Sequence, residues 1–200
     1  MSDPTPSAPP ISSDPNTLII SQLLFPALMP VFTCDLSTHR IALDLARVGM
    51  DELRALDPTP MQSNVMAQYV SPWDSHTRNA KFQPICEIVR QIALHVSKTF
   101  LTADLHALNM DYFVKDCWGI IYEKADHTRK HNHFPADVSC VMYIDAEPGC
   151  APLVFDNGVQ IQPKPNLLIM FPGVLNHEVP ATPGRRICIA MNLFKMAKFN

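Results

Sequence analysis

The pattern of apolar residues differs between the two halves of this chain. In the first half they return every three to four positions over residues 37–55 and, more regularly, over residues 84–101. Pro84 opens the second segment, where proline suits the first turn of a helix. The pattern predicts two helices, and the second should pack one apolar face on the sheet that follows.

From about residue 111 the apolar positions fall in short runs, which are cut by turn residues such as Glu147-Pro148-Gly149 and Asp156-Asn157-Gly158. Short runs at this spacing are typical of a β-sandwich or barrel. The predicted fold class is therefore α+β, with N-terminal helices packed on the sheet of a jelly-roll barrel. The predicted strands cover residues 112–114, 118–122, 138–144, 153–155, 159–161, 167–171 and 187–193.

The chain divides into three regions within one compact domain, which suits a length of 200 residues. Residues 1–16 are rich in proline and serine, a composition typical of disorder. Residues 17–110 form a largely helical extension, in which residues 18–20 could add a strand to the main sheet and residues 56–83 are predicted to be a long loop. Residues 111–200 form the jelly-roll core.

Charge and composition limit the cellular location and the classes of binding partner that we expect for this protein. The net charge of −3 gives no electrostatic case for nucleic acid or for an anionic membrane as a partner. The sequence lacks the features of a signal peptide and any apolar stretch of the roughly 20 residues that a membrane helix needs. Six scattered cysteines without a CxxC pair favour buried free thiols in a reducing compartment. We expect a cytoplasmic protein, with a monomer and a homodimer both left open.

The candidate chemistry lies in the second half. His131 and His133 are two residues apart, so on one strand their imidazoles would point to the same face and converge on one point. His177 follows a later apolar run, and Arg185 and Arg186 open the last one. Imidazole is the commonest metal ligand in proteins, so this order indicates a metal site.

These segments resemble the Fe(II)/2-oxoglutarate-dependent oxygenases, and they look closest to a small bacterial and phage-type subgroup. The resemblance covers the last 80 to 90 residues, from about Trp118 onward, and implies a double-stranded β-helix, the jelly-roll or cupin-like barrel. The matching segments are His131-Asn132-His133, Ser139, Tyr143, Phe171-Pro172-Gly173, His177, Arg186-Ile187-Cys188-Ile189 and Asn192.

The resemblance implies a role for each matching residue. His131, His133 and His177 would bind Fe(II), and Arg186 would hold the remote carboxylate of 2-oxoglutarate, for which its two parallel donors suit it. Four further residues would line the cofactor pocket, namely Tyr143, Cys188, Asn192 and Trp118. The implied reaction consumes O₂, hydroxylates a small-molecule or side-chain substrate, and releases succinate and CO₂.

One position departs from the family pattern, because His133 stands where the family has a carboxylate. Three interpretations remain open. The three histidines could form an all-histidine triad, Asp137 could supply the carboxylate, or the site could be degenerate. Asp126 and Glu178 are weaker carboxylate candidates.

Two other functions compete with this one. A three-histidine dioxygenase of the cupin kind would use O₂ alone and would not need Arg186. A non-enzymatic jelly roll could use the histidines to bind another metal or for structure only. The sequence does not identify the substrate.

Overall fold

The computed structural model describes residues 20–23, 29–101 and 103–198. The predicted disordered segment 1–16 lies outside this range, as do the first two residues of the strand expected at 18–20. The described part of that region, Ile20–Leu23, forms strand β1 and pairs with β2, which joins the main sheet as expected.

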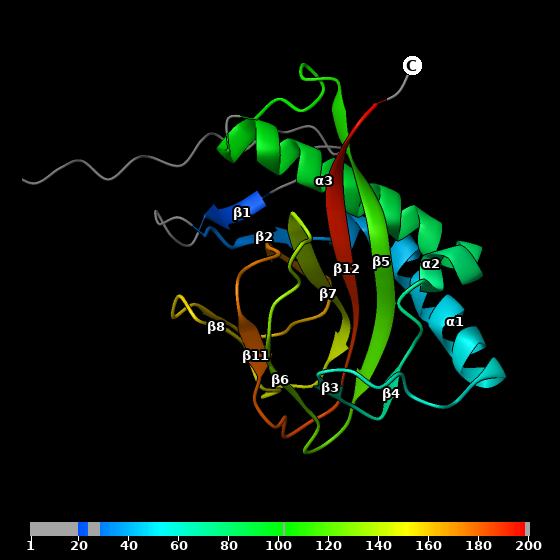
Figure 1. Cartoon of the computed structure of the whole chain (residues 1–200). Coiled ribbons are helices and arrows are strands. Elements are labelled where there is room, and N and C mark those ends of the chain that lie inside the picture. Colours follow the sequence, from blue (N-terminus) through cyan, green and yellow to red (C-terminus); the bar gives the residue numbers. More distant parts are fainter. Residues whose placement is uncertain (1–19, 24–28, 102, 199–200) are drawn as a thin grey trace, which may run out of the picture.

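Two antiparallel sheets form the core of the molecule (Figure 1). The larger sheet has the strand order β1-β2-β10-β7-β12-β5-β4, and the smaller sheet has the order β3-β6-β11-β8-β9. This is a double-stranded β-helix, so the predicted fold class is confirmed. The strands are β1 Ile20–Leu23, β2 Phe32–Asp35, β3 Val65–Met66, β4 Tyr69–Val70, β5 Met110–Tyr122, β6 His127–His131, β7 Val138–Ala146, β8 Leu153–Phe155, β9 Gln160–Ile161, β10 Leu167–Pro172, β11 His177–Val179 and β12 Arg186–Ala197.

The helices cover the outer face of the larger sheet, whereas β6, β8 and β11 lie on its inner side (Figure 1). The two long helices are close to the predicted segments, and two 3₁₀ turns and a short helix accompany them. The bounds are η1 Ser37–His39, α1 Arg40–Leu56, α2 Ser75–Arg78, η2 Ala80–Phe82 and α3 Gln83–Phe100. Among the described residues, no helix is long and apolar enough to cross a membrane.

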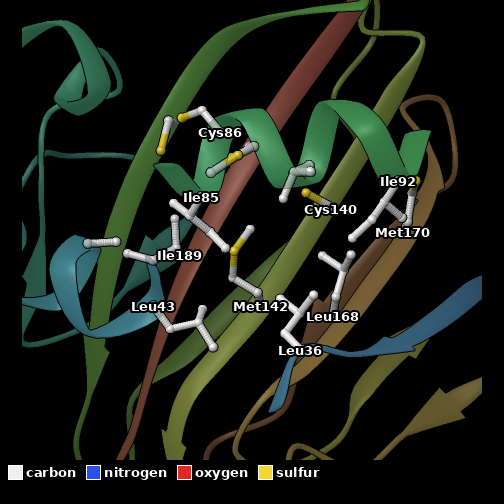
Figure 2. Close-up of a cluster of buried hydrophobic side chains, with 14 of the residues drawn as sticks. Leu36, Leu43, Ile85, Cys86, Ile92, Cys140, Met142, Leu168, Met170 and Ile189 are labelled. Atoms are coloured by element: carbon white, nitrogen blue, oxygen red, sulfur yellow. The ribbon is translucent and has the colours of Figure 1, made fainter. Parts of the chain in front are cut away.

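The central strands are buried on both faces, which explains their nearly continuous apolar runs. On β12, Ile187, Ile189 and Met191 face the helices, where Figure 2 shows Ile189 near Ile85 and Leu43. The alternate residues of the same strand belong to a second cluster between the two sheets. Each central strand therefore has a helix-facing side and an interior side.

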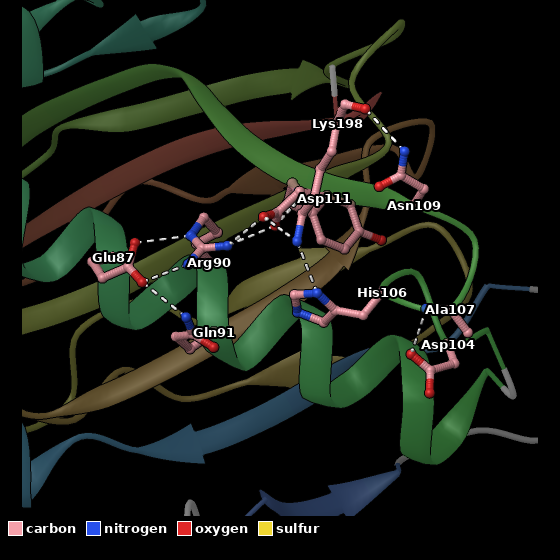
Figure 3. Close-up of polar contacts among 10 residues, drawn as sticks. Glu87, Arg90, Gln91, Asp104, His106, Ala107, Asn109, Asp111 and Lys198 are labelled. Atoms are coloured by element: carbon pink, nitrogen blue, oxygen red, sulfur yellow. Dashed lines mark hydrogen bonds and ion pairs between the residues drawn. The ribbon is translucent and has the colours of Figure 1, made fainter. Parts of the chain in front are cut away.

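A polar network ties α3 to the same sheet. Nη1 of Arg90 donates hydrogen bonds to both carboxylate oxygens of Asp111 on β5, at 2.6 and 2.8 Å, and Nε donates to Glu87 (Figure 3). Lys198 lies 3.5 Å from Asp111 and donates to His106. These contacts lie on the helical side of the sheet.

The prediction missed several strands. The expected segments 112–114 and 118–122 belong to one strand, β5, and the expected loop at 56–83 contains β3, β4 and α2. β6 was missed because its sequence, His127–His131, is polar and has only one fully buried residue, Thr128. Pairing with β11 and β3 holds this segment in the strand conformation, and its sequence has no alternation of apolar and polar residues from which the strand could be predicted.

Gly119 allows α1 to approach β5 closely. A Cβ built at this position would clash with Sδ of Met50 and would lie 2.8 Å from Cγ of the same side chain, which is fully buried. We predict that Gly119→Ala lowers the free energy of unfolding by about 1–3 kcal/mol, because an added methyl overpacks this contact. Urea unfolding of both proteins measures the change.

The control is to make Gly119→Ala in a protein that already carries Met50→Ala. Removing the Met50 side chain opens space for the new methyl group, so Gly119→Ala should cost much less in this background than in the wild type. An equal cost in the two backgrounds would contradict the contact as the cause.

Candidate metal centre and adjoining cavities

Pairing of β6 with β11 brings two of the predicted histidines together. His131 ends β6, His177 begins β11, and the two residues are direct partners in the register, with ring centroids 4.4 Å apart. His133 comes from the segment after β6, where its backbone N–H donates to Gly173 O at 2.7 Å. Each of the three imidazoles offers a nitrogen, and these nitrogens all lie within 4.8 Å of one another.

Backbone carbonyls set the tautomers of two of the rings. Nδ1 of His131 lies 2.8 Å from Arg129 O, and Nδ1 of His177 lies 3.0 Å from Leu175 O. Because a carbonyl oxygen only accepts, Nδ1 must carry the hydrogen in both rings, and Nε2 keeps its lone pair. Such contacts from the outer nitrogen are typical of histidines that bind metals.

The surroundings keep all three rings neutral. Burial lowers the pKa of His133 to about 3, with a further contribution from the two neighbouring imidazoles. Burial and the proximity of His131 lower the pKa of His177 to about 4, and burial also lowers the pKa of His131. At neutral pH the cluster therefore offers lone pairs, as a divalent metal requires.

No carboxylate belongs to this cluster in the described part of the chain. Asp137 accepts a hydrogen bond from the backbone N–H of Lys195 at 2.8 Å and pairs with its Nζ at 3.1 Å. Asp126 accepts the backbone N–H groups of Gln68 and Glu123. The donor set is three imidazoles, which suits divalent Fe, Zn, Cu or Ni.

A narrow inner cavity of about 50 Å³ extends from the triad to Arg186. The Arg186 side chain is only 1% exposed, and Nη1 donates to Ala151 O at 2.9 Å. Its guanidinium carbon lies 4.2 Å from the ring centroid of Tyr122, while Nε has no hydrogen-bond partner among the described residues. A buried guanidinium that lacks an anionic partner is costly, so the cavity is suited to an anion.

Most of the residues expected around the cofactor line this cavity. Tyr143, Cys188, Trp118 and Arg186 do so, and burial raises the pKa of the Cys188 thiol to about 11, which keeps it uncharged. Asn192 does not line it. Arg185 lies outside as well and pairs with Glu123 at 3.1 Å.

Sequence reasoning missed Tyr122, whose ring packs against the Arg186 guanidinium and whose hydroxyl lies 2.6 Å from that of Thr128. Its position in β5 could have been found by parity, because Trp118 and Tyr122 are four residues apart and share a strand face. The Ala151 carbonyl carries no sequence signal, since any residue would supply it.

An outer cleft of about 340 Å³ adjoins the inner cavity at two of the histidines, His131 and His133. It shares Val65, Trp118, His131 and His133 with the inner cavity as common walls. Asn192 lines this cleft, together with three aromatic side chains that the sequence analysis did not predict as site residues, Trp73, Phe134 and Phe194. A molecule in the outer cleft would therefore contact His131 and His133 without occupying the space next to Arg186.

Comparison with known proteins finds similar folds among solved structures. No family model and no curated protein matches the sequence. Among solved structures, a prolyl-4-hydroxylase from Pseudomonas putida is 17% identical, with a TM-score of 0.51 over 78% of this chain and 88% of that one. A viral collagen prolyl hydroxylase from Paramecium bursaria Chlorella virus-1, solved with 2-oxoglutarate, is 14% identical, with a TM-score of 0.57 over 82% and 94%.

A third similar structure is a prolyl hydroxylase from Trichoplax adhaerens in complex with a peptide fragment of hypoxia inducible factor. It is 14% identical, with a TM-score of 0.55 over 76% of this chain and 78% of that one. At these identities the likeness is one of fold. It confirms the resemblance to 2-oxoglutarate-Fe(II) oxygenases at that level.

The lowered histidine pKa values predict a pH-dependent stability of the metal-free protein. Unfolded histidine titrates near pH 6.5, so between pH 6.5 and 4 the unfolded chain binds more protons than the folded one. The free energy of unfolding should fall as the pH falls through this window, by at most about 1.4 kcal/mol per pH unit for each histidine. Urea unfolding at several pH values measures the slope.

His133→Asn should make this slope shallower by removing one of the titrating groups. Asn132→Ala alters the same segment and leaves all three imidazoles in place, so it should keep the wild-type slope. Equal slopes in His133→Asn and the wild type would show that His133 binds protons equally in the folded and the unfolded chain, which would contradict its lowered pKa.

Proposed function

We propose that this protein is a non-haem Fe(II)/2-oxoglutarate-dependent oxygenase that hydroxylates its substrate. The observation that supports this most strongly is the pairing of two features along one cavity. Three uncharged imidazoles face one another at one end, and at the other lies a buried guanidinium that has no anionic partner among the residues the structure describes. A dicarboxylic keto acid has groups for both ends.

In this proposal Nε2 of His131 and of His177 and one nitrogen of His133 would hold Fe(II), which would supply the redox chemistry with O₂ beside a keto acid in the inner cavity. An all-histidine set is favoured over one with Asp137, because that carboxylate is engaged by Lys195 on β12. A degenerate site is disfavoured, since the two Nδ1–H groups are already held for ligation through Nε2.

Arg186 would bind the remote carboxylate of 2-oxoglutarate with a charge-assisted hydrogen bond. Nε, now without a partner, is one available donor, and the Tyr122 ring holds the guanidinium plane in place. Tyr143, Cys188 and Trp118 form the walls. Their neutral, buried character excludes water and strengthens the interaction of the arginine with an anion.

When bound, iron and 2-oxoglutarate supply the oxidising chemistry: one oxygen atom of O₂ enters the substrate as a hydroxyl, the other enters succinate, and CO₂ is released. The residues of the chain select the substrate and orient the groups that would hold the metal and the keto acid. Phe155 and Phe171 pack against the His177 ring, with centroids 5.9 and 4.8 Å away, and fix its orientation. The outer cleft is the natural place for the substrate, which we infer to be a small molecule or a side chain.

A three-histidine dioxygenase that uses O₂ alone is the second candidate. The missing carboxylate in the triad favours it. Arg186 counts against it, because that reaction has no use for a buried cation at the far end of the cavity.

The test is an anaerobic visible spectrum of purified protein titrated with Fe(II) and then with 2-oxoglutarate. We expect a charge-transfer band that requires both additions. Arg186→Leu should still bind Fe(II) but bind 2-oxoglutarate roughly 10- to 100-fold more weakly, the loss expected for a charge-assisted hydrogen bond of about 1.5–3 kcal/mol. His177→Ala should bind neither.

Arg185→Leu is the matched control, since it removes a neighbouring arginine that lies outside the cavity, and it should keep the band. Fe(II) binding without a band, unchanged in Arg186→Leu, would support the cofactor-free dioxygenase. Absence of any affinity for Fe(II) would contradict both enzymes and would leave a jelly roll with structural histidines.

A further inference from the structure

A row of polar side chains crosses the interior face of the larger sheet. Ser139 on β7, Asn192 on β12 and Asp116 on β5 occupy the same register position on three neighbouring strands. The Ser139 hydroxyl donates to Oδ1 of Asn192 at 2.8 Å, and Nδ2 of Asn192 donates to Oδ2 of Asp116 at 2.9 Å. Ser139 and Asn192 are buried, so this row holds the Asp116 carboxylate in a fixed place.

Asp116 lies at the wall of the outer cleft. Its Oδ2 accepts from Asn192, whereas Oδ1 has no hydrogen bond or ion pair within the described ranges. Asp116 and Trp118 share one face of β5 at a spacing of about 7 Å, and the Trp118 ring contacts His133 at 5.8 Å between centroids. The carboxylate therefore lines the same cleft as His131 and His133.

A β-bulge at this point adds a second charge to the cleft. Asn192 pairs with Asp116 and Leu193 pairs with Val114, so Lys115 is the extra residue. Lys115 also lines the cleft, but it forms no ion pair with Asp116 in the described structure, and its Nζ lies 5.2 Å from the ring centroid of Phe194. Asp116 is thus left available for a ligand.

Four aromatic side chains lie in the walls of the cleft, beside smaller polar ones such as Ser63 and Asn64. Trp73, Trp118, Phe134 and Phe194 line it, and the two tryptophan rings lie 6.2 Å apart. Trp73 and Phe134 are 47% and 73% exposed, although large aromatic side chains usually bury more of their surface. Aromatic faces around one available carboxylate form a site for a cation that carries an apolar group.

We propose that Asp116 determines substrate specificity by binding a protonated nitrogen of the substrate, an ammonium or a guanidinium, whose apolar part lies against the aromatic walls of the outer cleft. Ser139 and Asn192 are positioning residues that orient the carboxylate. This inference rests on the proposed function only for the identity of the ligand as the substrate. The cation site itself does not require iron.

Tryptophan fluorescence tests the proposal directly, because the chain has only two tryptophans and both line the cleft. Metal-free protein is titrated with 2-phenylethylamine, which is protonated at pH 7, and with its neutral analogue 2-phenylethanol. We expect the amine to quench the fluorescence with at least about tenfold higher affinity than the alcohol. Asp116→Asn should remove this difference, since the amide still fits the row but carries no charge.

Asp44→Asn is the matched control, because it removes a carboxylate from the exposed face of α1, and it should keep the preference for the amine. Lys115→Met should keep or increase the preference by removing a like charge. Thermal unfolding of each variant confirms that it is folded. The proposal is overturned if neither probe binds, if both bind equally, if Asp116→Asn retains the preference, or if Lys115→Met abolishes it.

The two proposals fail separately. Asp116→Asn should form the charge-transfer band with Fe(II) and 2-oxoglutarate as the wild type does, because Asp116 does not line the inner cavity. A band without any preference for the amine would overturn this inference alone. A preference for the amine in wild-type protein that forms no band would overturn the proposed reaction and leave the cation site in place.

Discussion

Burial of strands β5, β7 and β12 on both faces is the constraint that organises this molecule. Helices α1 and α3 cover one face, and the smaller sheet covers the other, so the buried side chains in the central parts of these strands belong to one of two environments. Strand parity alone decides which environment it enters. Arg186, Cys188, Ala190 and Asn192 alternate with Ile187, Ile189 and Met191, and only the first set reaches the interior.

Two sets of polar groups on that interior face lead to a cavity. Arg186 reaches the inner cavity, where burial without an anion would be unfavourable unless the cavity receives one. The row that starts at Ser139 ends in the outer cleft, where its buried members satisfy one another's hydrogen bonds. Two of the histidines, His131 and His133, line both spaces, so one strand face presents polar groups to two adjoining cavities.

The smaller sheet supplies two histidines of the triad, although the sequences of the two strands that carry them show little preference for β structure. β6 is polar, and β11 is three residues long. The pairing of these two strands nevertheless brings His131 opposite His177, while the backbone contact of His133 with Gly173 brings in the third ring from outside the strand. The prediction that His131 and His133 share one strand was wrong in this detail, although both rings converge as expected.

The sequence by itself determined the two helices, most strands of the larger sheet and the residues that gather at the triad and around Arg186. The helices and strands follow from local periodicity. The site residues follow from side chains with a characteristic chemistry, the histidine pair His131 and His133 and the arginine Arg186 near the end of the chain. Only the tertiary structure decided that Asp137 pairs with Lys195, that Asn192 belongs to the outer cleft, and that Asp116 lies beside Trp118 near the histidines. Those outcomes depend on register between strands that are far apart in the chain, on one bulge at Lys115, and on hydrogen bonds across strands, none of which leaves a local pattern in the sequence.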